Sequence, residues 1–273
     1  MKRNILLLFT FFACITVQGQ TPVRLVDLRS EHLDRPIGLD NPVPRLSWRM
    51  EDGRQGAVQT SWRIVVDEDS LNVVNGCGRM WDSGKNDSRN QLVAYAGKKL
   101  QRFTRYYWKV ICSDMEYKET ASPVSYFETG MMGMQHWQGA WIGDGKDIHY
   151  GPAPYFRKEF KTGKKVKSAR AYIAAAGLYE LYINGEKIGD HCLPPLYTRF
   201  DRRNLYVAYD VTSQLQNGDN AIGVLLGNGW YNHQSKAVWD FDRAPWRNRP
   251  AFCLDLRITY TDGSVETIPT DLS

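Results

Sequence analysis

Short runs in which hydrophobic and polar residues alternate recur along this chain at hairpin intervals. They include SWRIVVDE, TRYYWKVIC, YFRKEF, YELYING, LYVAYDV and FCLDLRITY, and clusters of Gly, Asn, Asp and Pro separate them. A period of two is typical of strands that bury one face, whereas the 3.6-residue period of long amphipathic helices is missing from the sequence. The pattern therefore predicts an all-β protein made of sandwiches or barrels.

The alternation is interrupted near residues 130 to 137, where MMGMQHWQ has no clear period. Residues 21–130 have the size of an immunoglobulin-like or fibronectin-like sandwich, and residues 137–273 contain a second series of strands. Four tryptophans of the first unit lie in strand-like runs with polar neighbours, which favours core packing over sugar stacking. These are Trp48, Trp62, Trp81 and Trp108.

The first nineteen residues have the composition of an export signal. Lys2 and Arg3 precede an uncharged apolar run, and small residues follow at Val17-Gln18-Gly19. This run is shorter than a membrane-spanning helix requires, so residues 1–19 are predicted to be a signal peptide of a secreted or periplasmic protein without a membrane span.

Charge and cysteine usage narrow the possible partners. The formal net charge of the full chain is +5, and without the two basic residues of the signal 33 basic residues stand against 30 acidic ones. This near balance gives no reason to expect a nucleic-acid partner.

The spacing of the cysteines indicates neither a zinc site nor a disulfide framework. Cys112 and Cys253 lie in strand-like runs, as expected of buried free thiols.

The most informative stretch is 171–231. Tyr179, Leu181 and Ile183 alternate with polar neighbours, and Asn184-Gly185 supplies the two left-handed residues of a tight hairpin. A later strand, AIGVLL, leads into Gly227-Asn228-Gly229-Trp230-Tyr231. Glycines beside an amide and two aromatic rings allow close approach of a ligand, and sugars need both an aromatic face and hydrogen-bonding groups.

These residues resemble a known family. The pattern GLYELYING…YDVT…NAIGVLLGNGWY is similar to the N-terminal β-sandwich of bacterial α-L-rhamnosidases, and PRLSWRM…QTSWRIVV…WDSGK…YYWKV resembles the fibronectin-like domain that precedes it. The resemblance covers nearly all of the mature chain. It implies a fibronectin-like sandwich followed by a jelly-roll sandwich of the galactose-binding type, as in sugar-binding domains of β-galactosidase-like enzymes.

The resemblance also implies a function. Members of the family release terminal L-rhamnose from polysaccharides by inverting hydrolysis, with an acid and a base in a large α/α barrel that follows the sandwiches. We identify no part of the barrel and no catalytic residue in this sequence, and we expect one further strand after TDGSVETIPTDLS. Some rhamnosidase sandwiches bind the sugar through calcium, so Ca²⁺ is a possible cofactor here, although no cofactor is required.

The sequence therefore gives a set of candidate site residues and three candidate functions. The predicted carbohydrate-binding residues are Asn228, Trp230, Tyr231, Trp239 and Asp240, and the predicted calcium ligands are Asn184, Asn228 and Asp201. The favoured function is the non-catalytic N-terminal portion of a secreted α-L-rhamnosidase that binds carbohydrate or supports the catalytic barrel. The alternatives are a free-standing lectin-like module and a scaffold that binds no sugar.

Overall fold

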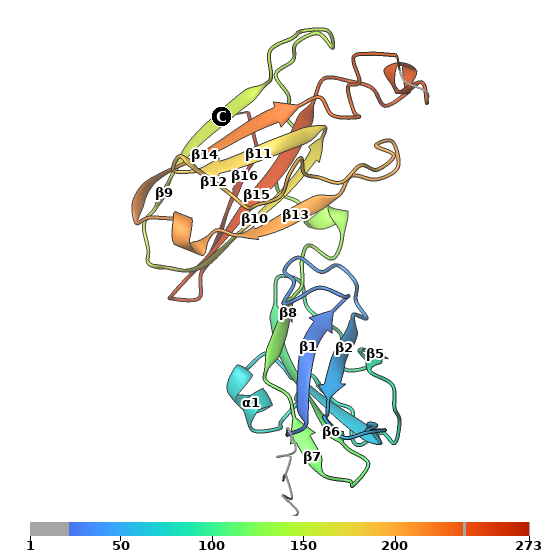
Figure 1. Ribbon diagram of the computed structural model, residues 1–273. Coiled ribbons are helices and arrows are strands. Elements are labelled where there is room, and N and C mark those ends of the chain that lie inside the picture. Colours follow the sequence, from blue (N-terminus) through green and yellow to red (C-terminus); the bar gives the residue numbers. More distant parts are fainter. Residues whose placement is uncertain (1–21, 237–238, 273) are drawn as a thin grey trace, which may run out of the picture.

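The computed structural model describes residues 22–236 and 239–272, and the predicted signal peptide at residues 1–19 lies outside them. Strands dominate, and they fall into two groups with the short 3₁₀ helix η1 (Met134–His136) between the groups (Figure 1). The predicted all-β fold is confirmed. Within the described residues no helix is both long and apolar enough to cross a membrane.

The first group is a sandwich of three strands against five. One sheet has the order β1-β2-β5, and the other has the order β4-β3-β6-β7 with β8 also paired to β6. A single helical turn, α1 (Ser70–Val74), joins β3 to β4. The strands are β1 (Arg24–Ser30), β2 (Arg45–Glu51), β3 (Ser61–Asp67), β4 (Trp81–Asp82), β5 (Leu92–Ala94), β6 (Arg105–Ser113), β7 (Glu119–Ala121) and β8 (Ser125–Glu128).

Tryptophans fill the core of this sandwich, as their positions in alternating strands predict. Trp48, Trp62 and Trp108 are buried, and Trp81 is partly buried against the same cluster. The Trp48 indole N–H donates to the side-chain oxygen of buried Gln59 at 2.8 Å, so its polar atom is satisfied inside the core.

The second group is a sandwich of four strands against four. One sheet has the order β13-β10-β15-β16 and the other β12-β11-β14-β9. Two further 3₁₀ turns occur in its connections, η2 (Thr212–Gln214) and η3 (Phe241–Arg243). The strands are β9 (Tyr155–Thr162), β10 (Val166–Ala176), β11 (Leu178–Ile183), β12 (Glu186–Lys187), β13 (Tyr206–Asp210), β14 (Gly218–Gly227), β15 (Ala251–Tyr260) and β16 (Val265–Pro269).

The alternation in β11 places its side chains as expected. Tyr179, Leu181 and Ile183 are buried between the sheets, in contact with the cluster that β10, β14 and β15 supply. Asn184 and Gly185 have φ angles of 52° and 86°, which is the backbone of the two-residue hairpin turn that leads to β12.

Buried polar contacts join the two sandwiches. Arg170 of β10 reaches Glu128 of β8 through two hydrogen bonds of 2.7 and 3.1 Å, and both side chains are almost fully buried. The hydroxyl of Tyr206 donates to Asp40 at 2.8 Å and accepts from the Met131 backbone N–H at 3.1 Å. These contacts pair buried polar groups of the two sandwiches with one another, so they favour this arrangement of the junction.

Candidate functional site

The predicted sugar-contacting residues lie in the loop between β14 and β15, at one end of the second sandwich (Figure 1). Gly227 pairs with Leu178, so the loop leaves the sheet beside the start of β11. The long connection from β12 to β13 contacts this loop, because Phe200 packs against Tyr231 with ring centroids 5.2 Å apart.

The two loops form one aromatic surface, which we call the aromatic rim. Phe241 is its centre, with ring centroids 5.4 Å from Trp230, 5.8 Å from Trp239 and 5.6 Å from Tyr197. Trp239 is 71% exposed, Tyr197 45% and Trp230 43%. Large rings rarely remain this exposed in a cluster without a partner, so the aromatic rim is a candidate binding surface. It consists of Tyr197, Phe200, Trp230, Tyr231, Trp239 and Phe241.

Local contacts orient the two tryptophans differently. The Trp230 ring stacks on His233, with centroids 5.3 Å apart and an interplanar angle of 22°, so one of its faces is covered. Trp239 follows residues 237–238, which the structure does not describe, and contacts Phe241 at an angle of 41°. The Trp239 ring is therefore the more open of the two surfaces.

Asn232 holds the loop in place beneath the aromatic rim. It is fully buried, donates to the Ile148 carbonyl at 2.8 Å and accepts from Arg247 at 3.1 Å. Its amide also donates to the side-chain oxygen of Asn228 at 3.2 Å. Asn228, which was predicted to contact sugar, is thus tied to the loop, although its second lone pair and its own N–H₂ group leave capacity for a ligand.

The buried side chain of Arg249, near the end of the same loop, binds the segment that precedes β9. Arg249 forms a two-pronged contact with Asp144, with its nearest pair at 2.7 Å, and donates to the carbonyls of Tyr150 and Pro152. The hydrogen bond from Arg249 is the main reason that the pKa of Asp144 lies below its usual value. This charge-assisted network connects the rim loop to the segment before β9 and limits its movement.

Polar atoms also occur in the rim loop. Asp240 is exposed, has a left-handed backbone with φ 52°, and its carbonyl accepts from the Arg243 N–H. Asp242 Oδ1 and Trp246 Nε1 are buried and have no hydrogen-bond partner among the described residues. Burial raises the pKa of Tyr231, which keeps its hydroxyl protonated and able to donate.

The three predicted calcium ligands are not assembled into one site. Asn184 follows the end of β11 that pairs with Ile222, whereas Asn228 follows the end of β14 that pairs with Leu178. The pairing is six residues long, so its two ends are separated by roughly 17 Å, whereas calcium–oxygen distances are about 2.4 Å. One ion therefore cannot bind both amides.

The side chains of the other two predicted ligands have local partners. Asn184 donates to Asn220 and to the Gln214 carbonyl and accepts from the Ala221 N–H, all within 2.9 Å. The Asp201 carboxylate accepts two hydrogen bonds from Arg199, at 2.8 and 3.0 Å. Across 22–236 and 239–272 no three His, Cys, Asp or Glu side chains are grouped closely enough to hold a metal ion.

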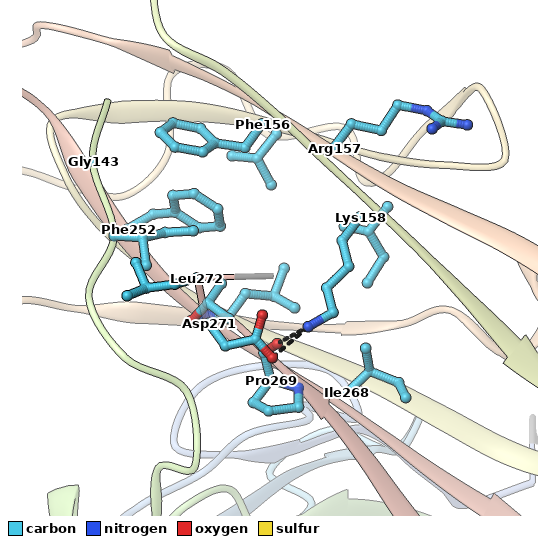
Figure 2. A pocket seen from close by; sticks show the side chains of 14 residues that line it. Gly143, Phe156, Arg157, Lys158, Phe252, Ile268, Pro269, Asp271 and Leu272 are labelled. Atoms are coloured by element: carbon cyan, nitrogen blue, oxygen red, sulfur yellow. Dashed lines mark hydrogen bonds and ion pairs between the residues drawn. The ribbon is translucent and has the colours of Figure 1, made fainter. Parts of the chain in front are cut away.

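A concave feature of the same sandwich lies apart from the aromatic rim, along one edge of the two sheets. An apolar groove of about 250 Å³ lies between the edge strands β9 and β16, and Phe156 packs there against Phe252 with ring centroids 5.1 Å apart. Figure 2 shows the side chains that line it. An ion pair between Lys158 and Asp271 crosses its polar end. Its aliphatic and aromatic lining suits apolar side chains better than sugar hydroxyls, so the aromatic rim remains the better candidate for a carbohydrate.

The fold and the rim define a protein region with two β-sandwiches and an aromatic surface at one end of the second sandwich. Residues 25–133 match the family model described as the Rha78A-like, N-terminal immunoglobulin domain, and residues 164–273 match the alpha-L-rhamnosidase N-terminal domain. The chain therefore corresponds to the N-terminal region of the α-L-rhamnosidases.

Individual relatives agree with this assignment. An α-L-rhamnosidase of Formosa agariphila is 32% identical over 96% of this chain, and another, of an Alteromonas species, is 29% identical over 86%. The solved α-L-rhamnosidase of Dictyoglumus thermophilum superposes with a TM-score of 0.82 at 36% identity over 91% of this chain and 29% of its own. That of Aspergillus terreus gives 0.79 at 27% identity, covering 92% of this chain and 29% of its own. This chain spans about 30% of the length of the Formosa relative.

Proposed function

We propose that this chain is the non-catalytic N-terminal portion of a secreted α-L-rhamnosidase and that its aromatic rim binds an L-rhamnose-containing glycan. The observation that carries the proposal is the exposed pair Trp230 and Trp239 around Phe241, in a loop that Asn232 holds in place. The names of the relatives supply the substrate class, because they are α-L-rhamnosidases.

The chemistry of the aromatic rim fits a neutral sugar. The apolar C–H face of a pyranose packs on an indole ring, and Trp239 offers a ring that is 71% exposed. Hydroxyl groups need nearby donors and acceptors, which the side chains of Asn228, Tyr231 and Asp240 provide. A 6-deoxy sugar also carries a methyl group, which an aromatic surface accommodates well.

Variants separate this role from a purely structural one. We expect Trp239→Ala to weaken binding of a rhamnose-containing oligosaccharide about tenfold, which corresponds to roughly 1.4 kcal/mol, the upper range for a single aromatic contact. Tyr117→Ala removes a ring of similar exposure, 74%, from the first sandwich and should leave binding unchanged. Calorimetric titration measures both constants. If the wild-type chain gives no heat at millimolar sugar, the scaffold alternative replaces the lectin role.

Activity and export are tested separately. We propose that this region does not hydrolyse glycosides, so the isolated chain should release no detectable chromophore from an aryl α-L-rhamnoside, and turnover would overturn this part. We also propose that residues 1–19 direct export. N-terminal sequencing of protein recovered outside the cytoplasm should begin directly after Gly19, and recovery of an intact Met1 terminus would contradict export by this signal.

A further inference from the structure

A small polar cavity lies at the junction of the two sandwiches, away from the aromatic rim. Its volume is about 160 Å³. The first sandwich contributes Arg102 and Phe103, the connecting segment contributes His136 and Gln138, and the second sandwich contributes the remaining polar side chains. Those of the second sandwich are Tyr172, Asp255, Arg257 and Thr267. Three separate parts of the chain therefore meet around one space.

Tyr172 lines this cavity, and its buried hydroxyl has no hydrogen-bond partner among the described residues. Tyr172 is 1% exposed, and its oxygen makes no hydrogen bond to any described residue. Burial raises the pKa of this phenol well above its usual value, so the group is a neutral O–H donor. A buried donor without an acceptor costs free energy, which indicates that the position suits an acceptor not supplied by the described residues.

Two guanidinium groups line the same cavity without a carboxylate partner. Among the described residues, no Asp or Glu lies within ion-pair distance of Arg102 or Arg257. Arg257 lies over the Phe103 ring, with its central carbon 4.5 Å from the centroid. Burial and, to a lesser degree, the positive charge of Arg102 lower the pKa of Arg257. Both guanidinium groups would gain from an anion placed between them.

The one carboxylate in the lining has other partners. Asp255 Oδ2 accepts from the Gln138 N–H at 2.9 Å, and Oδ1 accepts from the Gly139 N–H at 2.8 Å. These contacts anchor the connecting segment to β15. Arg102 Nη1 lies 2.6 Å from Nδ1 of His136. The guanidinium of Arg102 therefore contacts an imidazole ring and not a carboxylate. The lining thus contains two guanidinium groups and one carboxylate.

We propose that this cavity is a binding site for one small oxyanion, namely sulfate, phosphate or a carboxylate, held by Arg102, Arg257 and the Tyr172 hydroxyl. Guanidinium groups match the oxygens of such anions in two-pronged geometry, and the phenol supplies a further donor. The volume admits a single group of this size but not a disaccharide. Because its walls come from both sandwiches and the connecting segment, the bound anion would fix their relative orientation.

Titration of the full chain with sodium sulfate, phosphate or acetate, at ionic strength matched with NaCl, tests the site. We expect saturable binding by calorimetry and a rise in melting temperature that NaCl alone does not give. Glucuronic acid and a sulfated monosaccharide form a second arm. Binding of the sugar acids, but not of the inorganic ions, would assign the anion to a glycan, and the reverse result would assign it to a free ion.

Variants make the outcome decisive. Arg257→Gln should weaken anion binding at least tenfold. Tyr172→Phe should weaken it about fivefold while leaving the melting temperature in anion-free buffer unchanged or higher, because its hydroxyl has no protein partner to lose. Arg243→Gln, at an exposed arginine of the rim loop, is the charge-matched control and should bind as wild type. Absence of saturable binding, or equal binding by all variants, would overturn the proposal. Trp239→Ala should leave anion binding intact, so this result is independent of the glycan role.

Discussion

Loss of the buried ion pair between the sandwiches should destabilise the chain strongly. Arg170→Met removes the hydrogen bonds of 2.7 and 3.1 Å to Glu128, which is 6% exposed. Removal of one partner from a buried pair costs roughly 3–5 kcal/mol, because the other charge stays buried. Arg105 still lies 3.1 Å from Glu128 and offsets part of this, so we expect about 3 kcal/mol. Asp210 contributes little because it is half exposed.

For a chain of this size, about 3 kcal/mol corresponds to a fall in melting temperature of roughly 6–12 °C. Calorimetry and urea unfolding both measure it. Arg157→Met is the matched control, since its partner Glu159 and Arg157 itself are largely exposed, and it should change stability by less than about 0.5 kcal/mol. A double-mutant cycle with Glu128→Gln isolates the pair. The reasoning fails if Arg170→Met costs less than about 1 kcal/mol or if the cycle shows no coupling.

Further predictions concern pH, thiols and the junction. Burial opposes ionisation of Asp67, but hydrogen bonds, chiefly from Arg79, lower its pKa overall, so its contribution to stability is present above about pH 4 and is lost as the pH falls below that value. Asp67→Asn should therefore lower the unfolding free energy more at pH 7 than at pH 2; equal losses at both would refute this. Burial raises the pKa of Cys112 to about 12 and of Cys253 to about 11, so mass spectrometry after native alkylation should find both unmodified and should find Cys77 and Cys192, which are exposed, labelled. Tyr206→Phe should cost about 1–2 kcal/mol by leaving the Met131 N–H unpaired, measured by urea unfolding; no loss would show that this contact is dispensable.

The strands were predictable because their signal is local. Alternation alone places Tyr179 and Leu181 in the core, and the Asn184-Gly185 turn follows from two residues that tolerate left-handed backbone. The Arg170–Glu128 pair has no such signal. Its partners are 42 residues apart, and Arg170 stands in a strand where alternation gives no indication that its charge is buried and paired.

The candidate site was predictable only in part. Trp230 and Trp239 are recognisable from their loop composition, but Phe241, which contacts both rings, follows only from three-dimensional packing. Asn232 is one amide among several in the loop, and its burial depends on contacts with Ile148, far away in sequence. The calcium hypothesis joined Asn184 to Asn228 by residue type, and strand pairing places them at opposite ends.

Indole N–H resonances test the glycan role most directly. In ¹⁵N-labelled chain, titration with a rhamnose-containing oligosaccharide should shift the indole signals of Trp230 and Trp239, each assigned by a Trp→Phe variant. The signal of Trp108, buried in the first sandwich, should stay in place. Saturable shifts confined to the rim tryptophans are the predicted result. Unchanged rim signals at millimolar sugar, or shifts only elsewhere, would contradict carbohydrate binding at the aromatic rim.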